Sequence, residues 1–147
     1  MTTLNATARD AAVEVGVNAA TDVTGFGLLG HLSEVCEGSN LTAEIEFNKV
    51  PRLAAAARYV ALGSVPGGTG RNWASYGHKV SGSGGPVTDE QRAWLCDPQT
   101  SGGLLVCVEP AGRAAVQEVF ARYGLALESF GRLRAHAEGE AWVQVQA

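Results

Sequence analysis

The sequence has no excess of positive charge. It contains 11 lysines and arginines against 15 aspartates and glutamates, a formal net charge of −4 over 147 residues. Broad nucleic-acid binding normally needs a basic face, so no nucleic-acid partner is expected. A phosphate ligand is not excluded, because a loop and a helix N-terminus can bind anions through backbone N–H groups alone.

Cysteines are few and far apart. Cys36, Cys96 and Cys107 form no CxxC pair, which gives little support to a zinc or disulfide framework. Cys36 and Cys107 lie in apolar patterns typical of small core residues, whereas the role of Cys96, beside Asp97, is left open. Free thiols fit a reducing compartment, so we expect a cytoplasmic protein.

Long hydrophobic runs are lacking too. The first residues show no basic stretch followed by an apolar one, so no signal peptide is expected, and no apolar stretch is long enough to span a bilayer. We expect no membrane partner. The hydrophobic share of 46% is ordinary for a globular protein, and the length fits a single domain over residues 1–147.

What is present is a mixture of helical and strand periodicities. Helices are expected over 4–15, 26–37, 51–62, 87–95 and 110–123, and strands over 41–47, 104–108, 125–133 and 141–145. Because the order shows no strict βαβ rhythm, we expect an α+β domain with a mixed sheet covered by helices.

Some element boundaries carry their own signals. Thr88, with Gln91 three residues on, is typical of a capping box, and Gly38 suits the position just after a helix. Pro51 suits the first turn of the next helix. The continuous apolar run over 104–108 indicates a strand buried on both faces.

The segment from Gly63 to Pro86 interrupts the periodic pattern with eight glycines and two prolines. Long loops are usually functional or disordered. Two interpretations stay open: a mobile surface loop, or a flap that orders over a ligand or a neighbouring domain. Its Pro66–Asn72 stretch lacks the Gly-Lys-Ser/Thr ending of a Walker A loop, although Arg71 is able to meet a phosphate or a carboxylate.

The first candidate site is the stretch Ala20-Thr21-Asp22-Val23-Thr24-Gly25-Phe26-Gly27-Leu28-Leu29-Gly30-His31. Asp22 precedes a glycine-containing turn that leads into a helix, and Thr24 is able to cap that helix. Gly25 and Gly27 would let the backbone approach a ligand closely. An aspartate in this place can hold Mg²⁺ shared with phosphates, but Asp22 as a simple turn former and Thr24 as a simple cap explain the pattern as well.

The second candidate is Asp97-Pro98-Gln99-Thr100-Ser101-Gly102-Gly103. It is either an anion-binding nest or a tight turn that aims the following strand, and we favour the turn. His31 is more typical of a packed or solvated helical side chain than of a ligand. His31, His78 and His136 are scattered, and no motif pairs a histidine with a nucleophile, so no triad is expected.

Both stretches resemble a known family. The stretch from Ala20 to Leu32 closely resembles the start of the C-terminal domain of selenophosphate synthetases, and is similar in a looser way to the aminoimidazole ribonucleotide synthetase superfamily. The stretch Asp97-Pro98-Gln99-Thr100-Ser101-Gly102-Gly103-Leu104-Leu105-Val106 resembles selenophosphate synthetases in particular. The pair Leu4-Asn5, the Pro66–Asn72 segment and Phe130-Gly131-Arg132 are further similar features, so the resemblance covers nearly the whole chain.

The resemblance implies a three-layer α/β/α sandwich with a mixed sheet, partly ferredoxin-like. It implies a reaction in which ATP, selenide and water give selenophosphate, AMP and orthophosphate. ATP would be held largely by an N-terminal domain, with Mg²⁺ bridging its phosphates to aspartates. Asp22 matches the aspartate that the C-terminal domain contributes to that metal site, and Thr24, Gly25 and Gly27 match the adjoining turn.

The resemblance also implies what this sequence does not contain. The family's reactive cysteine or selenocysteine, a neighbouring lysine and further metal-binding aspartates belong to the N-terminal ATP-binding domain, and none of the three cysteines here matches that nucleophile. We therefore expect the chain to be inactive alone, to need that domain as its partner, and to form a homodimer within the full-length enzyme. The alternatives are a non-catalytic binding or assembly module, or part of another ATP-using relative such as an aminoimidazole ribonucleotide synthetase or a hydrogenase-maturation homologue.

Overall fold

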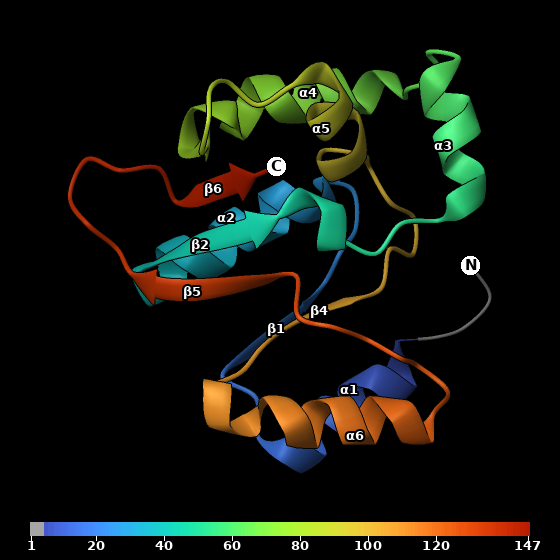
Figure 1. Cartoon of the computed structure of the whole chain (residues 1–147), viewed down its shortest axis with the longest axis vertical. Coiled ribbons are helices and arrows are strands. Elements are labelled where there is room, and N and C mark those ends of the chain that lie inside the picture. Colours follow the sequence, from blue (N-terminus) through green and yellow to red (C-terminus); the bar gives the residue numbers. More distant parts are fainter. Residues whose placement is uncertain (1–4) are drawn as a thin grey trace.

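The computed structural model describes residues 5–147 (Figure 1). Leu4, the expected start of the first helix, lies outside the described residues. The helices are α1 Ala6–Val15, α2 Gly27–Ser39, α3 Ala54–Ala61, α4 Gly67–Tyr76, α5 Asp89–Leu95 and α6 Arg113–Arg122, with short 3₁₀ turns η1 Phe47–Lys49, η2 Gly77–Lys79 and η3 Pro110–Gly112. The strands are β1 Ala19–Asp22, β2 Leu41–Glu46, β3 Val80–Gly82, β4 Leu104–Cys107, β5 Gly131–Ala135 and β6 Val143–Gln146.

The larger sheet is mixed, with the strand order β3-β6-β2-β5. β2 runs antiparallel to β5 and parallel to β6, and β3 runs parallel to β6. The alternation predicted for β2 is confirmed in part, because Ala43 and Ile45 are buried while Glu44 faces outward beside Arg132. Helix α2 packs on β2 and β6, and its fully buried Leu29 and Cys36 join the same core. The α+β class with a mixed sheet is therefore confirmed.

A second, two-stranded sheet joins β1 to β4 in antiparallel register, from Ala19 opposite Cys107 to Asp22 opposite Leu104. Helices α1 and α6 contact each other beside this ribbon (Figure 1). The prediction that β4 is buried on both faces is confirmed only in part, since Leu105 is buried whereas Leu104, Val106 and Cys107 are half-buried. A ribbon of two strands is too narrow to be covered completely. Leu105 faces the main core, whereas its neighbour Val106 packs against the smaller cluster of α6.

Helix ends agree with the sequence where a side chain makes the cap. The capping box is confirmed: the N–H of Gln91 donates to Thr88 Oγ1 over 3.2 Å, and the N–H of Thr88 donates to Gln91 Oε1 over 2.9 Å. The prediction for Gly38 is wrong, because α2 continues to Ser39 and ends at Asn40 with φ 54°. Asparagine, like glycine, tolerates this left-handed conformation. Pro51 precedes the first turn of α3, which begins at Ala54.

The C-terminal elements are shifted from their expected bounds. Pro110 opens a 3₁₀ turn, and α6 proper begins at Arg113. Val116, Val119 and Phe120 are buried as expected, whereas Tyr123, placed on the same face by its spacing, is exposed. Of the strand expected over 125–133, only the part from Gly131 onward belongs to β5, and Phe130 O just before it accepts a hydrogen bond from the N–H of Glu46.

The segment 63–86 is not a loop. Residues 67–76 form α4, followed by η2 and β3, which lies at the edge of the larger sheet. One face of α4 is buried through Thr69, Asn72 and Tyr76. Glycine weakens a helix, but tertiary contacts override that preference here. The mobile-loop interpretation of this segment is therefore wrong, whereas its interpretation as a cover over a ligand or a neighbouring domain stays a prediction.

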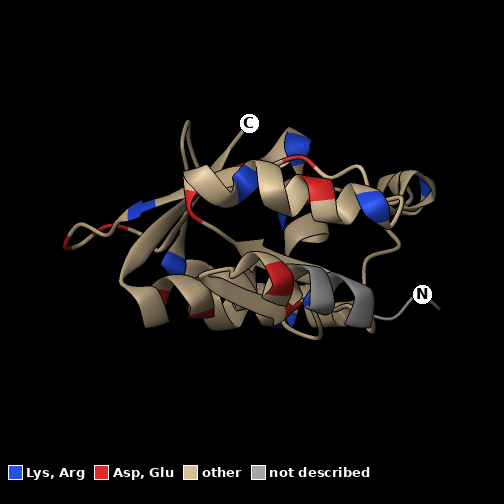
Figure 2. Ribbon diagram, turned by 90° about the horizontal axis from the view of Figure 1, so that it is seen from below, with Lys and Arg blue, Asp and Glu red and all other residues tan. Residues whose placement is uncertain are grey.

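The charged residues are spread over the molecule. Figure 2, seen from below, shows basic and acidic positions interspersed rather than gathered by sign. This agrees with the small net charge. Among the described residues, none of the helices is long and apolar enough to cross a membrane.

Candidate phosphate- and metal-facing site

The fold brings the two candidate stretches together at one end of the small sheet. β1 ends at Asp22, and β4, its antiparallel partner, begins opposite it at Leu104. The turn that follows β1 must therefore lie next to the turn that precedes β4. These are the 23–27 turn and the 97–103 turn, and both names are kept below.

Three backbone hydrogen bonds join the two turns. The N–H of Val23 donates to Gly103 O over 2.9 Å, and the N–H of Gly102 donates to Val23 O over 3.1 Å. The N–H of Gln99 donates to Thr24 O over 3.0 Å. The backbone N–H groups of Gln99 and Gly102 thus bind the 23–27 turn and cannot bind an anion. This supports the tight-turn interpretation of the 97–103 turn over an anion nest.

The two glycines of the first turn have different surroundings. Gly27 has φ 69°, and a Cβ there would lie 2.8 Å from the carbonyl carbon of Cys96. Its lack of a side chain is therefore needed for packing against the chain just before Asp97. Gly25 has no heavy atom within 4 Å of the position of a Cβ, and the residue is exposed. Gly25 alone leaves open space on the outer side of the turn.

Thr24 does not cap the helix, and the prediction that it does is wrong. Gly25 and Phe26 separate it from the first helical residue, so its hydroxyl cannot reach the free N–H groups of α2. Its backbone N–H instead donates to His31 Nε2 over 3.1 Å, and its hydroxyl lies 3.1 Å from the same nitrogen. His31 Nδ1 lies 3.5 Å from a carboxylate oxygen of Glu34, which fits a neutral ring protonated at Nδ1. The buried His31 is thus a packed side chain that braces the turn.

Asp22 is exposed at the end of β1 and lines a groove of about 600 Å³ between α1 and the small sheet. An exposed aspartate with open space before it fits a single hard-oxygen ligand of Mg²⁺, which usually keeps waters and substrate phosphates as its other ligands. Within residues 5–147, no group of three or more His, Cys, Asp and Glu side chains gathers to hold a metal. The remaining ligands would have to come from outside the described residues.

Sequence reasoning missed Arg9 of α1, which lines the same groove as Asp22. A guanidinium and a carboxylate in one groove suit a phosphate that carries a cation. Arg9 stands among alanines in an otherwise ordinary helix, and only the packing of α1 beside β1 reveals its position.

Asp97 and Arg71, which the sequence analysis also singled out, lie outside the groove that Asp22 lines. Asp97 is partly buried, which raises the pKa of its carboxyl group, and it accepts a hydrogen bond from the side-chain amide of Gln99. Arg71 is exposed on α4. Neither side chain is placed with Asp22 in its groove.

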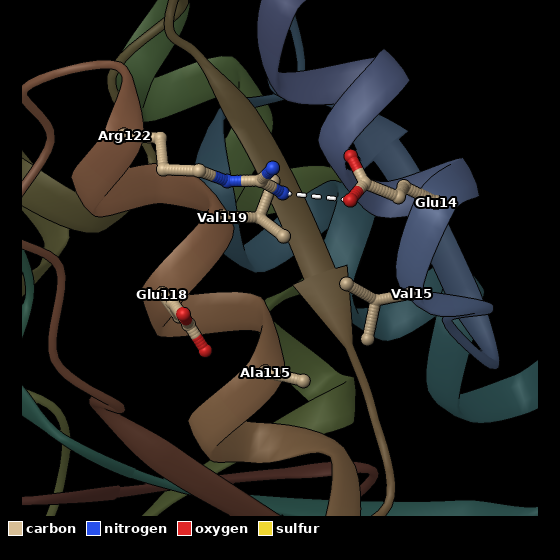
Figure 3. A pocket seen from close by; sticks show the side chains of 6 residues that line it. All are labelled: Glu14, Val15, Ala115, Glu118, Val119 and Arg122. Atoms are coloured by element: carbon tan, nitrogen blue, oxygen red, sulfur yellow. Dashed lines mark hydrogen bonds and ion pairs between the residues drawn. The ribbon is translucent and has the colours of Figure 1, made fainter.

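A second groove of about 480 Å³ lies between α1 and α6 (Figure 3). Glu14 and Arg122 point toward each other across it and form an ion pair of 2.7 Å, with Val15 and Val119 between the helices. Exposed pairs of this kind contribute little to stability. None of the candidate site residues lines this groove.

Comparisons with known proteins agree with the motifs. Residues 1–144 match the family model of the AIR synthase related protein, C-terminal domain. The chain is 51% identical over 146 residues to a selenide, water dikinase of Cronobacter sakazakii, covering 99% of the chain and 41% of that relative. It is 53% identical over 131 residues to one of Haemophilus influenzae, covering 89% and 37%, and 56% identical over 118 residues to one of Pseudomonas putida, covering 80% and 33%.

The chain thus covers 41%, 37% and 33% of the lengths of these three relatives, which is well under half of each. The matched family model and the order of the two turns along the chain support the same family. The chain belongs to the family of AIR synthase related proteins, as their C-terminal domain, and its resemblance to the selenophosphate synthetases is confirmed.

Proposed function

We propose that the chain is the C-terminal half of a selenophosphate synthetase, which makes selenophosphate, AMP and orthophosphate from ATP, selenide and water. In this proposal it contributes one phosphate- and metal-facing edge, and an ATP-binding half supplies most of the nucleotide site. The observation that carries the proposal is the convergence of both family motifs on the turn after Asp22, through three backbone hydrogen bonds.

Asp22 is the residue that would hold Mg²⁺. When bound, this ion neutralises phosphate charge during phosphoryl transfer. Asp22 ends a strand, so its backbone is fixed by pairing with Leu104, while its side chain stays exposed in the groove shared with Arg9. The carboxylate can therefore bind the metal ion without any rearrangement of the sheet.

The adjoining turn would face the phosphates. Among the described residues, none accepts a hydrogen bond from the N–H of Gly25 or Phe26, and both residues are exposed. Such N–H groups in front of a helix attract anions. We assign Thr24, Gly25 and Gly27 to this edge, with Gly25 as the point of closest approach because only Gly25 leaves open space.

The nucleophile of the reaction would lie in the other half. Burial raises the pKa of Cys36 to about 11 and also raises the pKa of Cys96 and Cys107. Cys36 and Cys96 are fully buried. A reactive cysteine needs an exposed thiolate, and these thiols stay protonated at neutral pH, which supports core roles for them. We extend the proposal to a homodimer of the complete enzyme.

The substitution Asp22→Asn tests this function in the two-domain enzyme, meaning this chain joined to an ATP-binding half. Asparagine keeps the size and the turn-forming ability but removes the charge. We expect AMP formation to need much more Mg²⁺, with a nearly unchanged melting temperature, because the exposed carboxylate has no packing role.

The matched control is Asp89→Asn, since Asp89 is exposed on α5 and, among the described residues, its carboxylate bonds to Arg92 alone, in its own helix. It should leave the Mg²⁺ titration unchanged. Wild-type rates of Asp22→Asn at every Mg²⁺ concentration would rule out the metal role.

A further inference from the structure

Two side chains of α4 bind the carbonyl groups of the 23–27 turn. Asn72 Nδ2 donates to Gly25 O over 2.9 Å, and the Tyr76 hydroxyl donates to Phe26 O over 2.5 Å. The two residues lie four positions apart, so they occupy one face of the helix. Asn72 Nδ2 also donates to Cys96 O over 3.0 Å, directly before the 97–103 turn.

Both donors are held in place by packing. Asn72 and Tyr76 are buried, and the Tyr76 ring lies where a Cβ on Gly30 would come within 3.0 Å of it, so glycine at that position of α2 admits the ring. Burial raises the pKa of Tyr76 well above its usual range, so its hydroxyl stays a neutral donor. The exposed 23–27 turn is therefore bound on its inner side to one rigid face of α4.

A hydrogen bond to a backbone carbonyl also sets the direction of the N–H group in the same peptide. In a trans peptide the C=O and the next residue's N–H lie in one plane and point in opposite directions. Gln99 holds the carbonyl of Thr24, Asn72 that of Gly25 and Tyr76 that of Phe26. Fixing the first two carbonyls on the inner side directs the N–H groups of Gly25 and Phe26 away from the protein. The Tyr76 bond fixes the next peptide, whose N–H, that of Gly27, donates to Thr24 O over 3.0 Å and closes the turn.

We propose that Asn72 and Tyr76 are positioning residues, which hold the 23–27 turn so that the N–H groups of Gly25 and Phe26 face the phosphates of the metal-bound nucleotide. The inference rests on the proposed function and deepens it. It also gives the segment 63–86 a role: the segment forms α4, whose one face sets the geometry of the edge.

The test compares Tyr76→Phe and Asn72→Ala with wild type. The first removes one hydroxyl and keeps the ring. In the purified chain, we expect the backbone N–H of Gly27, which donates to Thr24 O over 3.0 Å within the turn, to exchange with solvent faster by NMR, while the N–H groups of β2 do not change. In the two-domain enzyme, we expect the Mg²⁺ concentration for half-maximal AMP formation to rise roughly three- to tenfold, the usual effect of losing one hydrogen bond.

The midpoint of the Mg²⁺ titration separates positioning from folding. Partial unfolding lowers the amount of active enzyme and hence the maximal rate, whereas a misdirected turn raises the midpoint. Tyr59→Phe is the matched control, because Tyr59 is exposed on α3, and it should change neither measurement.

The variant Asp22→Asn, measured beside them, distinguishes the two proposals. A raised midpoint for Asp22→Asn together with wild-type midpoints for Tyr76→Phe and Asn72→Ala would overturn the positioning role and leave the proposed function standing. Unchanged exchange at the turn in both α4 variants would also overturn it. Wild-type titrations of all three variants would overturn the proposed function and the inference with it.

Discussion

Gly25 and Gly27 show how neighbouring residues of one type can serve different purposes. Gly27 has a positive φ and contacts the backbone of Cys96, so its missing side chain is required by the fold. Gly25 meets nothing, and its φ is not in the region that favours glycine. In the proposed function, the close approach of a ligand is the reason for a glycine at this position.

We therefore predict opposite outcomes for two identical substitutions. Gly27→Ala should lower the free energy of unfolding by about 2–4 kcal/mol, from the left-handed backbone and the clash together. Gly25→Ala should leave stability within about 0.5 kcal/mol, yet raise the KM for Mg²⁺–ATP in the two-domain enzyme.

Urea unfolding of both variants and steady-state kinetics of the second check this prediction. A stable Gly25→Ala enzyme with a wild-type KM would show that the turn does not approach the nucleotide. A Gly27→Ala domain as stable as wild type would contradict the close packing between the two turns.

At the scale of elements, the connection from β5 to β6 is held by a polar network. Arg134 donates to both oxygens of Glu140 and also to Glu44 of β2. The Thr42 hydroxyl, fully buried, donates to Glu140 and lies 2.9 Å from His136 Nδ1. One carboxylate thus ties two strands and their connection together.

This network predicts an acid-dependent loss of stability. The bonds from Arg134, the N–H of Ala137 and Thr42 hold the pKa of Glu140 well below its usual value of 4.5. A lowered pKa in the folded state stabilises the protein at pH values above the unfolded pKa, and this contribution is lost as the pH falls below it. Glu140→Gln should therefore lower the melting temperature at pH 7, and the difference from wild type should shrink below about pH 4.5.

Thermal unfolding from pH 7 to pH 3 tests this, with Glu138→Gln, an exposed neighbour in the same connection, as the control. A difference between Glu140→Gln and wild type that stays constant over the whole range would show that charge at Glu140 is irrelevant.

The element that sequence reasoning placed worst is α4. Thr69, Asn72, Trp73 and Tyr76 follow helical spacing, and that signal was present within the segment. Three glycines inside the helix argue against it on propensity alone, because glycine lacks a side chain to restrict the unfolded chain. Burial of one face against α2 and α5 decides the conformation instead.

At the scale of the whole molecule, we predict that the chain alone does not make selenophosphate. Phosphoryl transfer needs nucleophile, metal and phosphates held together, and among the described residues Asp22 is the one carboxylate that lines the proposed site. The purified chain with ATP, Mg²⁺ and selenide should form AMP at the background rate only.

Adding a separately expressed ATP-binding half of a selenide, water dikinase should restore selenide-dependent AMP formation, and Asp22→Asn should reduce it. Turnover by the chain alone well above background would contradict this division of the site.

The sequence by itself determined the features that depend on neighbouring residues: the α+β class, the capping box at Thr88, the turn after Asp22 and the two family motifs. Local spacing is enough for these, because caps, turns and periodicity act within a few residues. Only the tertiary structure decided that the two turns meet, that Thr24 binds His31 rather than capping α2, and that Asn72 and Tyr76 reach the turn from 47 and 50 residues away. Such contacts arise from packing of whole elements, which no short stretch of sequence encodes.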